Sequence, residues 1–206
     1  MDAEDYLNLD KILNAQTPKT TEPLEMVFIV AHQASELWFK VLIQELTQLI
    51  EVPKDKHPNI LQENNRLVLT GYGQDYNPII QFQRIIKIFK HLQSLWDILA
   101  TISPDEYEKF RPKLDDAFSK QSVQYIKIEP LLHKLIRRWN YKYDQQLLDV
   151  EAAFKLWQFV HVKTVERIVG DKPILSGMQR SIDYLRRNLD HPLRVDQYWN
   201  GMRRSS

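Results

Sequence analysis

Two of the six histidines lie inside apolar, aromatic-rich stretches, where an imidazole could bind a metal. His32 follows residues 28–31 (FIVA), and His161 follows residues 156–160 (LWQFV). On a helical face, one ring nitrogen of a histidine can ligate iron while the other donates a hydrogen bond. Each could also be a hydrogen-bonded core histidine, and the surroundings of either one alone favour that alternative. The other histidines fall in loops or on mixed helical faces and are expected at the surface: His57, His91, His133 and His191.

A tyrosine and an arginine form a second set that could do chemistry. Tyr107 and Arg111 are four residues apart, and this spacing places both side chains on one face of a helix. The guanidinium group is a planar fork that can hold a carboxylate through two hydrogen bonds. An exposed helix with an incidental arginine is the alternative for this pair. No HExxH or two-histidine, one-carboxylate spacing occurs, so no other metal site of known pattern is indicated.

Periodic apolar residues predict the helices that must position these side chains. Ser103 to Glu106 predicts the start of a short helix, because it supplies an N-cap, a proline at the first helical position and acids in the first turn. Gly170 is expected to cap the last long helix. The other helices are expected at residues 5–14, 25–51, 78–101, 121–138 with a boundary or kink near Pro130, 145–170 and 176–189, and loops at 53–65 and 71–78.

The composition predicts one soluble, cytoplasmic domain. The chain has 206 residues, 28 Lys plus Arg and 27 Asp plus Glu, so its formal charge of +1 argues against binding nucleic acid or an acidic membrane surface. It has no cysteine, which excludes disulfides, thiolate-bound haem and iron–sulfur clusters. The acidic N-terminus lacks the pattern of a signal peptide, and no apolar run is expected to reach the roughly 18 residues of a membrane span.

Four blocks of sequence resemble the tryptophan 2,3-dioxygenase family. Residues 25–40, EMVFIVAHQASELWFK, are similar to that family's E-x-x-F-I-x-x-H-Q-x-x-E-L-W-x-K block. Residues 6–16 (YLNLDKILNAQ) resemble its Y-L-x-L-D-x-L-L-x-A-Q start, and residues 107–111 (YEKFR) its Y-x-x-F-R element. Residues 148–165 resemble its L-V-D-V-E…L-W-x-x-x-H-x-x-T-V helix. The blocks occur in the family's order and extend over most of the chain.

The resemblance implies an all-α fold, a single-domain helical bundle over residues 1–206 that encloses haem b. It assigns His161 as the ligand to the haem iron, with Trp157 also lining the cofactor. His32 corresponds to the catalytic histidine that faces the substrate ring, and Phe28 to a residue that packs on the indole. Arg111 corresponds to the clamp for the substrate carboxylate, with the Tyr107 hydroxyl beside it.

Departures from the family pattern gather on the substrate side. The chain lacks a helical segment between the Arg111 region and residue 149, and residues 120–126 (KQSVQYI) keep only part of a G-F-Q-S-x-Q-x-R motif. A glycine-rich substrate loop is replaced by residues 170–177, where Ser176 could substitute for its threonine hydroxyl. In the family, residues of the N-terminal segment contact the substrate site of a neighbouring subunit, and residues 1–24 could do the same here. Tyr6 and Leu7 are retained for this contact, although Ala3 replaces another tyrosine of the family.

The resemblance therefore implies an oxygenase that uses O2 and an aromatic amino acid, most like the conversion of L-tryptophan to N-formylkynurenine in tryptophan catabolism through the kynurenine pathway. A haem-dependent hydroxylase of a tyrosine- or indole-type substrate is the first alternative. A haem-binding sensor or carrier without catalysis is the second. A homo-oligomer, either dimer or tetramer, is expected, with the homotetramer typical of the family.

Overall fold

The computed structural model describes residues 3–51, 59–63, 66–70, 78–114, 124–139 and 143–170, together with positions 183, 186, 187, 189 and 193. Within these ranges the chain is mainly α-helical, as predicted. The helices are α1 (Ala3–Leu7), α2 (Leu9–Leu13), α3 (Pro23–Glu51), α4 (Pro78–Leu99), α5 (Pro104–Phe110), α6 (Tyr125–Trp139) and α7 (Asp144–Val169), and a 3-10 turn, η2 (Arg111–Lys113), follows α5.

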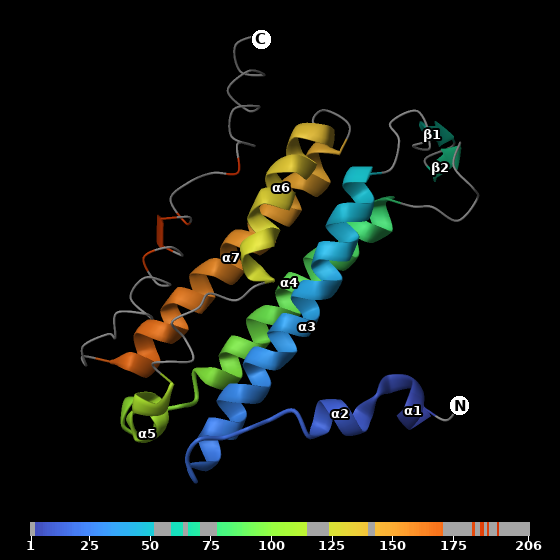
Figure 1. The fold of residues 1–206 in the computed structure, drawn as a ribbon. Helices are drawn as coiled ribbons and strands as arrows, with labels where there is room; N and C mark the ends of the chain where they lie inside the picture. The colour runs from blue at the N-terminus through green and yellow to red at the C-terminus, as the bar shows by residue number, and fades with distance from the viewer. Residues whose placement is uncertain are drawn as a thin grey trace.

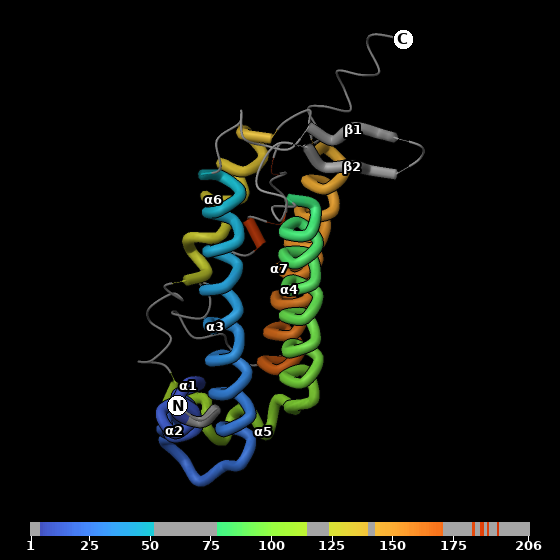
Figure 2. The backbone as a smooth tube through the Cα atoms, turned by 90° about the vertical axis from the view of Figure 1, so that its right-hand side faces the viewer, coloured from blue at the N-terminus to red at the C-terminus, as the bar shows by residue number. Residues whose placement is uncertain are grey.

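Four long helices form an elongated bundle (Figures 1 and 2). In Figure 1, α3 and α6 run upward and α4 and α7 run downward, so α3 is antiparallel to α4 while α4 and α7 are parallel. Apolar side chains at helical spacing fill the centre, and fully buried members include Leu42, Phe89, Phe154 and Trp157. Ring contacts tie three of the helices together, with Phe39 of α3 and Phe89 of α4 both against Trp157 of α7. The core is therefore built from aromatic contacts between helices distant in sequence.

The helix ends follow the predicted capping chemistry. The Ser103 hydroxyl accepts a hydrogen bond from the Glu106 backbone N–H at 3.3 Å, and the Glu106 carboxylate accepts one from the Ser103 backbone N–H at 2.9 Å. This reciprocal capping box starts α5 at Pro104. α7 ends at Gly170, whose φ of 62° is disfavoured for residues with a Cβ.

The N-terminal segment is not the single helix that was predicted for residues 5–14. Asn8 adopts a left-handed backbone conformation, with φ 52° and ψ 41°, and divides the segment into α1 and α2. Asparagine tolerates this conformation better than most residues. Residues 3–16, called the arm from here on, lie beside the first turns of α3, at the end of the bundle that also carries α5 (Figure 2).

Two predictions about breaks in the chain were wrong. The loop expected at residues 53–65 contains a strand, β1 (Asn59–Glu63), which pairs antiparallel with β2 (Arg66–Thr70), so that Asn59 pairs with Thr70. Strands of five residues with little apolar alternation give a weak signal beside nearby prolines. Of the boundary or kink expected near Pro130, the boundary is absent, since α6 runs through this residue to Trp139.

By length and composition alone, α3 is apolar enough to cross a membrane, contrary to the expectation that no stretch would be. A single helix of this kind is weak evidence for a membrane protein. In this structure α3 buries one side against its neighbours, through residues such as Phe39, Leu42 and Leu46.

Candidate functional site

The two histidines singled out from the sequence both contact Trp96. The His161 ring stacks on Trp96, with centroids 3.9 Å apart and an interplanar angle of 14°. The His32 ring meets the edge of Trp96, with centroids 5.8 Å apart and an angle of 87°. The two imidazole centroids are thus separated by no more than the sum of these distances, 9.7 Å. α3, α4 and α7 each contribute one ring to this cluster.

His161 has the properties of a nitrogen ligand without a protein partner. Its ring is half-buried, and its Nδ1 atom is buried without a hydrogen-bond partner among the described residues. Burial, followed by the nearby His32, lowers the pKa of His161 to about 3, so the ring is neutral at physiological pH. A neutral imidazole is the form that ligates metals.

The indole nitrogens near His161 are also unsatisfied. Trp157 lies one turn earlier on α7, with its ring centroid 5.5 Å from that of His161. The Nε1 atoms of Trp96 and Trp157 are buried and make no hydrogen bond within the described ranges. Native proteins rarely leave such groups unpaired. An imidazole with an unused nitrogen among apolar rings therefore fits a flat, metal-bearing cofactor such as haem.

His32 is fixed by its own helix. Its Nδ1 lies 2.8 Å from the carbonyl oxygen of Phe28. Because a carbonyl can only accept, Nδ1 donates this hydrogen bond and Nε2 carries the ring's lone pair. Burial lowers the pKa of His32, although the bond to Phe28 opposes the shift, so this ring is also held neutral. The Phe28 ring packs against it with centroids 4.2 Å apart.

α5 adds Tyr107 to the same end of the bundle. The Tyr107 ring centroid is 5.9 Å from that of Phe28, and the tyrosine is only 1% exposed. Arg111 follows at the start of η2 and is 4% exposed, so both side chains are buried. One guanidinium nitrogen of Arg111 lies 3.3 Å from the Glu108 carboxylate. A carboxylate ligand would have to share Arg111 with Glu108.

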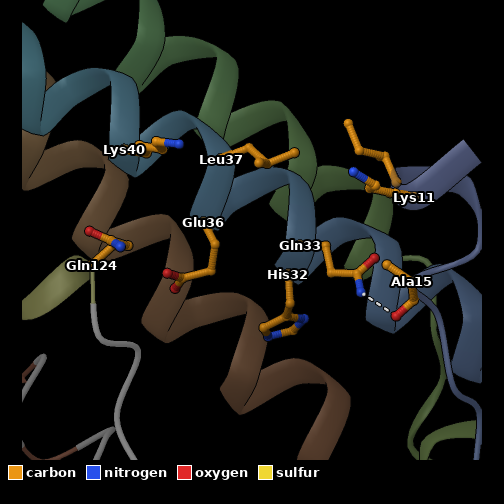
Figure 3. Close-up of a pocket in the computed structure, with 9 residues that line it drawn as sticks. Lys11, Ala15, His32, Gln33, Glu36, Leu37, Lys40 and Gln124 are labelled. Carbon is orange, nitrogen blue, oxygen red and sulfur yellow. Dashed lines mark hydrogen bonds between the residues drawn. The ribbon is translucent and has the colours of Figure 1, made fainter. Parts of the chain in front are cut away.

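A groove of about 520 Å³ opens on the outer side of His32 (Figure 3). One wall is the arm, through Lys11 and Ile12 of α2 and through Ala15. The other wall is α3, through His32, Gln33, Glu36, Leu37 and Lys40, and Gln124 closes one end. Tyr107 and Arg111 do not line it. The groove combines an apolar floor with charges of both signs, as small-molecule sites commonly do.

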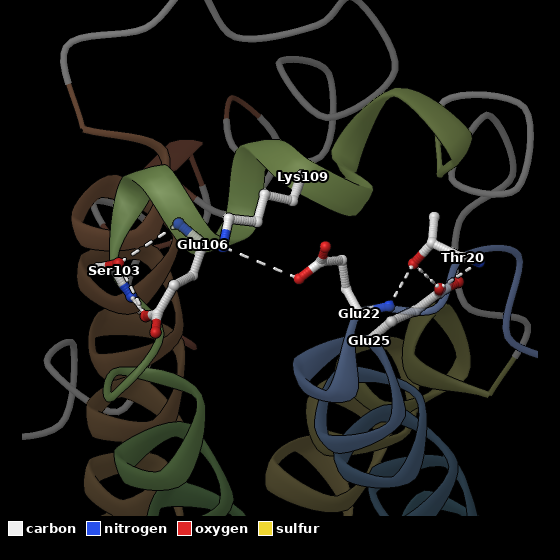
Figure 4. A network of polar contacts seen from close by, with 6 residues as sticks. All are labelled: Thr20, Glu22, Glu25, Ser103, Glu106 and Lys109. Atoms are coloured by element: carbon white, nitrogen blue, oxygen red, sulfur yellow. Dashed lines mark hydrogen bonds and ion pairs between the residues drawn. The ribbon is translucent and has the colours of Figure 1, made fainter.

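Polar contacts hold the turn at residues 19–20, which joins the arm to α3. The buried Glu25 carboxylate accepts hydrogen bonds from the backbone N–H groups of Lys19 and Thr20, both at 2.7 Å, and from the Thr20 hydroxyl at 2.5 Å. Burial raises the pKa of Glu25, but these hydrogen bonds outweigh it and the pKa is lowered overall. Glu22 also pairs with Lys109 of α5 at 3.9 Å (Figure 4).

The Gln33 side chain provides a further anchor, one turn along α3 from Phe28. Its amide oxygen accepts a hydrogen bond from the Gln16 amide at 2.7 Å, and its amide nitrogen donates to the Ala15 carbonyl at 3.2 Å. The turn at residues 19–20 and the end of the arm at residues 15–16 are thus both tied to α3.

Comparison with known proteins places this arrangement in a family. The sequence profile of tryptophan 2,3-dioxygenase matches residues 1–146. The chain belongs to the tryptophan 2,3-dioxygenase family. It is 30% identical to a tryptophan 2,3-dioxygenase of Bordetella parapertussis, over 90% of this chain and 85% of that protein. For a tryptophan 2,3-dioxygenase of Bacillus thuringiensis the identity is 28%, over 95% of this chain and 90% of the relative.

Membership of the tryptophan 2,3-dioxygenase family makes this chain a dioxygenase enzyme of tryptophan catabolism. The alignment with the Bordetella protein runs over 261 positions, more than the 206 residues of this chain. The relative therefore contains residues that this chain lacks, in agreement with the shortening inferred from the sequence. The family profile ends at residue 146, before His161, so the assignment of that histidine rests on the α7 motif and the geometry.

The structure brings most of the predicted site residues together at one end of the bundle. Phe28, His32 and Tyr107 form one contact group, and His161 and Trp157 join it through Trp96. Tyr6 and Leu7 are 74% and 50% exposed on the arm and do not line the groove of their own chain. Ser176 and residues 171–177 lie outside the described residues.

Sequence reasoning missed the role of Trp96 and of three charged side chains. Trp96 is one of several apolar residues that recur at helical spacing along its helix. Nothing in that spacing distinguished it from the residues that only fill the core. Glu25, Glu36 and Lys40 all stand in the family-like block at residues 25–40, so the signal was present. Their functions depend on what the arm places opposite them.

Proposed function

We propose that this protein is a cytoplasmic haem-dependent oxygenase that converts L-tryptophan and O2 into N-formylkynurenine. The observation that carries the proposal is the His161 imidazole, neutral, stacked on Trp96 and left with an unused buried nitrogen. In this proposal residues 1–206 act as one haem-binding domain.

On the cofactor side, His161 would hold the iron of haem b. Trp96 restrains the plane of the His161 ring by stacking, and Trp157 packs against it from the same helix. Haem, when bound, supplies the O2 chemistry, and the axial ligand and the polarity of the pocket tune it. Burial of the imidazole among aromatic rings lowers its pKa, which keeps it unprotonated and able to ligate.

On the substrate side, His32 would accept a hydrogen bond from the indole N–H. Its tautomer suits this role, because Nδ1 donates to the Phe28 carbonyl and leaves the lone pair on Nε2. The Phe28 ring would pack on the indole. Arg111 and Tyr107 would hold the substrate carboxylate, with Arg111 exchanging or sharing its contact to Glu108. Together these contacts would fix the orientation of the ring.

The proposal includes an assembled form of the enzyme. Tyr6 and Leu7, exposed on the arm of a single chain, would contact the substrate pocket of a neighbouring subunit in a dimer or tetramer. The Ser176 hydroxyl would contact the amino-acid end of the substrate.

Turnover with isotopically labelled O2 tests the reaction. Haem-loaded, reduced protein supplied with L-tryptophan and 18O2 is expected to give N-formylkynurenine that carries two labelled oxygen atoms, detected by mass spectrometry. Incorporation of one labelled atom would favour the hydroxylase alternative. Haem binding without oxidation of tryptophan, substituted tryptophans, tyrosine or indole would favour the non-catalytic alternative.

Replacement of Arg111 tests the carboxylate clamp. Arg111→Leu is expected to weaken L-tryptophan binding by about tenfold or more, because a charge-assisted hydrogen bond contributes about 1.5–3 kcal/mol. Tryptamine, which has no carboxylate, is expected to bind both proteins equally and serves as the control. If Arg111→Leu leaves the tryptophan affinity within about twofold, the clamp assignment is wrong.

A further inference from the structure

Gln158 is a buried polar residue of α7 that the proposed mechanism does not use. It is 0% exposed, and its amide nitrogen donates a hydrogen bond to the Tyr125 hydroxyl of α6 at 3.2 Å. Its amide oxygen, Oε1, is also buried and has no hydrogen-bond partner among the described residues. Native proteins pair almost all such groups, because an unpaired one costs free energy. The amide oxygen of Gln158 is therefore expected to meet a donor in the working protein.

His161 lies three residues after Gln158 on the same helix. Residues three apart on an α-helix are surface neighbours, about 60° apart around the axis, with Cβ atoms about 5–6 Å apart. The Nδ1 atom of His161 is buried and unpaired within the described part of the chain, although the residue as a whole is partly exposed. Two neighbouring side chains thus have one buried polar atom each without a partner.

Ligation of a metal by His161 would turn its Nδ1 atom into a donor. The nitrogen that binds a metal must be free of its proton, so the other nitrogen carries the N–H group and needs an acceptor. Because Nδ1 is the buried nitrogen, Nε2 is the one left for iron. The N–H group would then be buried beside Gln158, whose free atom is an acceptor.

The other histidine shows what His161 lacks. The Nδ1 atom of His32 is bonded to a backbone carbonyl of its own helix, that of Phe28, at 2.8 Å. His161 makes no such bond, and its ring is instead stacked on Trp96 with centroids 3.9 Å apart. The acceptor for the His161 N–H group therefore has to come from a side chain or a water molecule.

The rings around His161 cannot supply that acceptor. Trp96 and Trp157 both contact it, but an indole nitrogen is a donor only. Gln158 can, and its amide is held at the seam between α6 and α7 by the bond to Tyr125, whose own ring packs on Trp157 with centroids 5.1 Å apart. Gln158 and His161 make no hydrogen bond to each other in this structure. A turn of either side chain, or one bridging water, would complete the contact.

We infer that Gln158 is a positioning residue for the haem ligand: its amide oxygen accepts the hydrogen bond of the His161 Nδ1–H group, directly or through one water. The inference rests on the proposed function for the role of His161. An acceptor at this nitrogen fixes the orientation of a ligating imidazole and raises its basicity. A neutral amide does so less than a carboxylate, which leaves the iron easier to reduce and suits an enzyme that binds O2 in the ferrous state.

Resonance Raman spectroscopy of the haem-loaded, ferrous protein tests this contact through the iron–histidine stretching band. Gln158→Leu removes the acceptor and is expected to lower the band frequency, to raise the reduction potential and to weaken haemin affinity by about tenfold. Gln158→Glu supplies a stronger acceptor of nearly the same size and is expected to move the frequency and the potential in the opposite directions. A role in packing alone would not give opposite shifts.

Gln83→Leu is the matched control, because Gln83 is an exposed glutamine of α4, and it is expected to leave the band, the potential and the affinity unchanged. Circular dichroism melting of each variant establishes that the chain is folded. If Gln158→Leu does not fold, Gln158→Glu decides alone, and its band must rise.

A band that stays unmoved in both Gln158 variants, or that moves the same way in both, would overturn the inference and leave the proposed function intact. A native protein without an iron–histidine band, or a band that persists in His161→Ala, would instead show that His161 is not the ligand. That result would overturn the cofactor side of the proposed function and the inference with it.

Discussion

Two regions meet at His32 and are held together in different ways. On the inner side, Trp96, Trp157 and His161 lie between α4 and α7, where ring contacts at 3.9–5.5 Å fix them. Among the described residues, the two indole Nε1 atoms and the His161 Nδ1 atom have no hydrogen-bond partner. On the outer side, the arm and α3 enclose a groove fixed by hydrogen bonds of Glu25 and Gln33. The inner region depends on core packing and the outer region on a few polar contacts.

This difference shows how one half of the site can change while the other is kept. Core rings are contacted on all sides, so a substitution there disturbs the bundle. A surface segment tied by hydrogen bonds can be altered by changing one anchor at modest cost. The departures from the family pattern are accordingly found at Ala3, at residues 120–126 and at residues 170–177, and the α7 motif that contains His161 is retained.

The largest expected effect lies in the inner region. His161→Ala removes the proposed iron ligand and is expected to weaken haem affinity by on the order of a hundredfold or more, with a shifted Soret band. Titration of haem-free protein with haemin measures it. His133→Ala, which removes a half-buried histidine of α6 paired with Glu129, is the control and is expected to bind haem normally. Stoichiometric haem with an unchanged Soret band in His161→Ala would show that another residue is the ligand.

Core packing in the inner region predicts the next effect, on stability. Trp157 is 1% exposed and contacts Phe39, Tyr125 and His161, so Trp157→Ala is expected to lower the free energy of unfolding by about 3–5 kcal/mol. Trp38→Ala, at a tryptophan 37% exposed, is expected to cost less than about 1 kcal/mol. Urea denaturation measures both. Equal losses would mean that the inner region is not the more tightly packed one.

Glu25, which holds the turn between the arm and α3, is expected to have a smaller and pH-dependent effect on stability. In Glu25→Gln, one of the two carboxylate oxygens that accept backbone hydrogen bonds is replaced by an NH2 group, which can only donate. The substitution is expected to lower the free energy of unfolding by about 1–2 kcal/mol and to speed hydrogen exchange at Lys19 and Thr20. The folded pKa of Glu25 is lowered from 4.5, so its stabilisation is complete above pH 4.5 and is lost as the pH falls through the folded value. The native and variant proteins should therefore converge in stability at low pH; a constant gap would contradict the anchor.

The smallest expected effect is at α5, which carries Tyr107. Ser103→Ala removes the hydroxyl of the capping box and is expected to cost about 1 kcal/mol in unfolding free energy. Ser94→Ala, an exposed serine inside α4, is the control and should change stability by less than about 0.5 kcal/mol. Thermal melting of the two variants compares them. A larger loss in the control would show that α5 is not held by its cap.

Helix positions could be predicted from the sequence because they depend on local patterns. Residue type predicted the Ser103 cap and the end of α7 at Gly170. The spacing of apolar residues predicted the long helices. The hairpin at residues 59–70 and the break at Asn8 could not, since short strands give little periodicity and a left-handed asparagine has no distinctive neighbours. Pro130 is the sixth residue of α6, where a proline normally disfavours the helix, so the continuation of α6 through it was not predictable from residue type.

The sequence by itself determined the family and the helical class, and it singled out His32 and His161 as candidate site residues, because these depend on motifs read along the chain. Only the tertiary structure decided that Trp96 would contact both histidines, that Arg111 would lie against Glu108 and that Glu36 and Lys40 would line a groove with the arm. Each of these contacts joins residues through the packing of helices or the course of the arm. A periodic pattern fixes which face of a helix is buried, but not which side chain of another helix it meets.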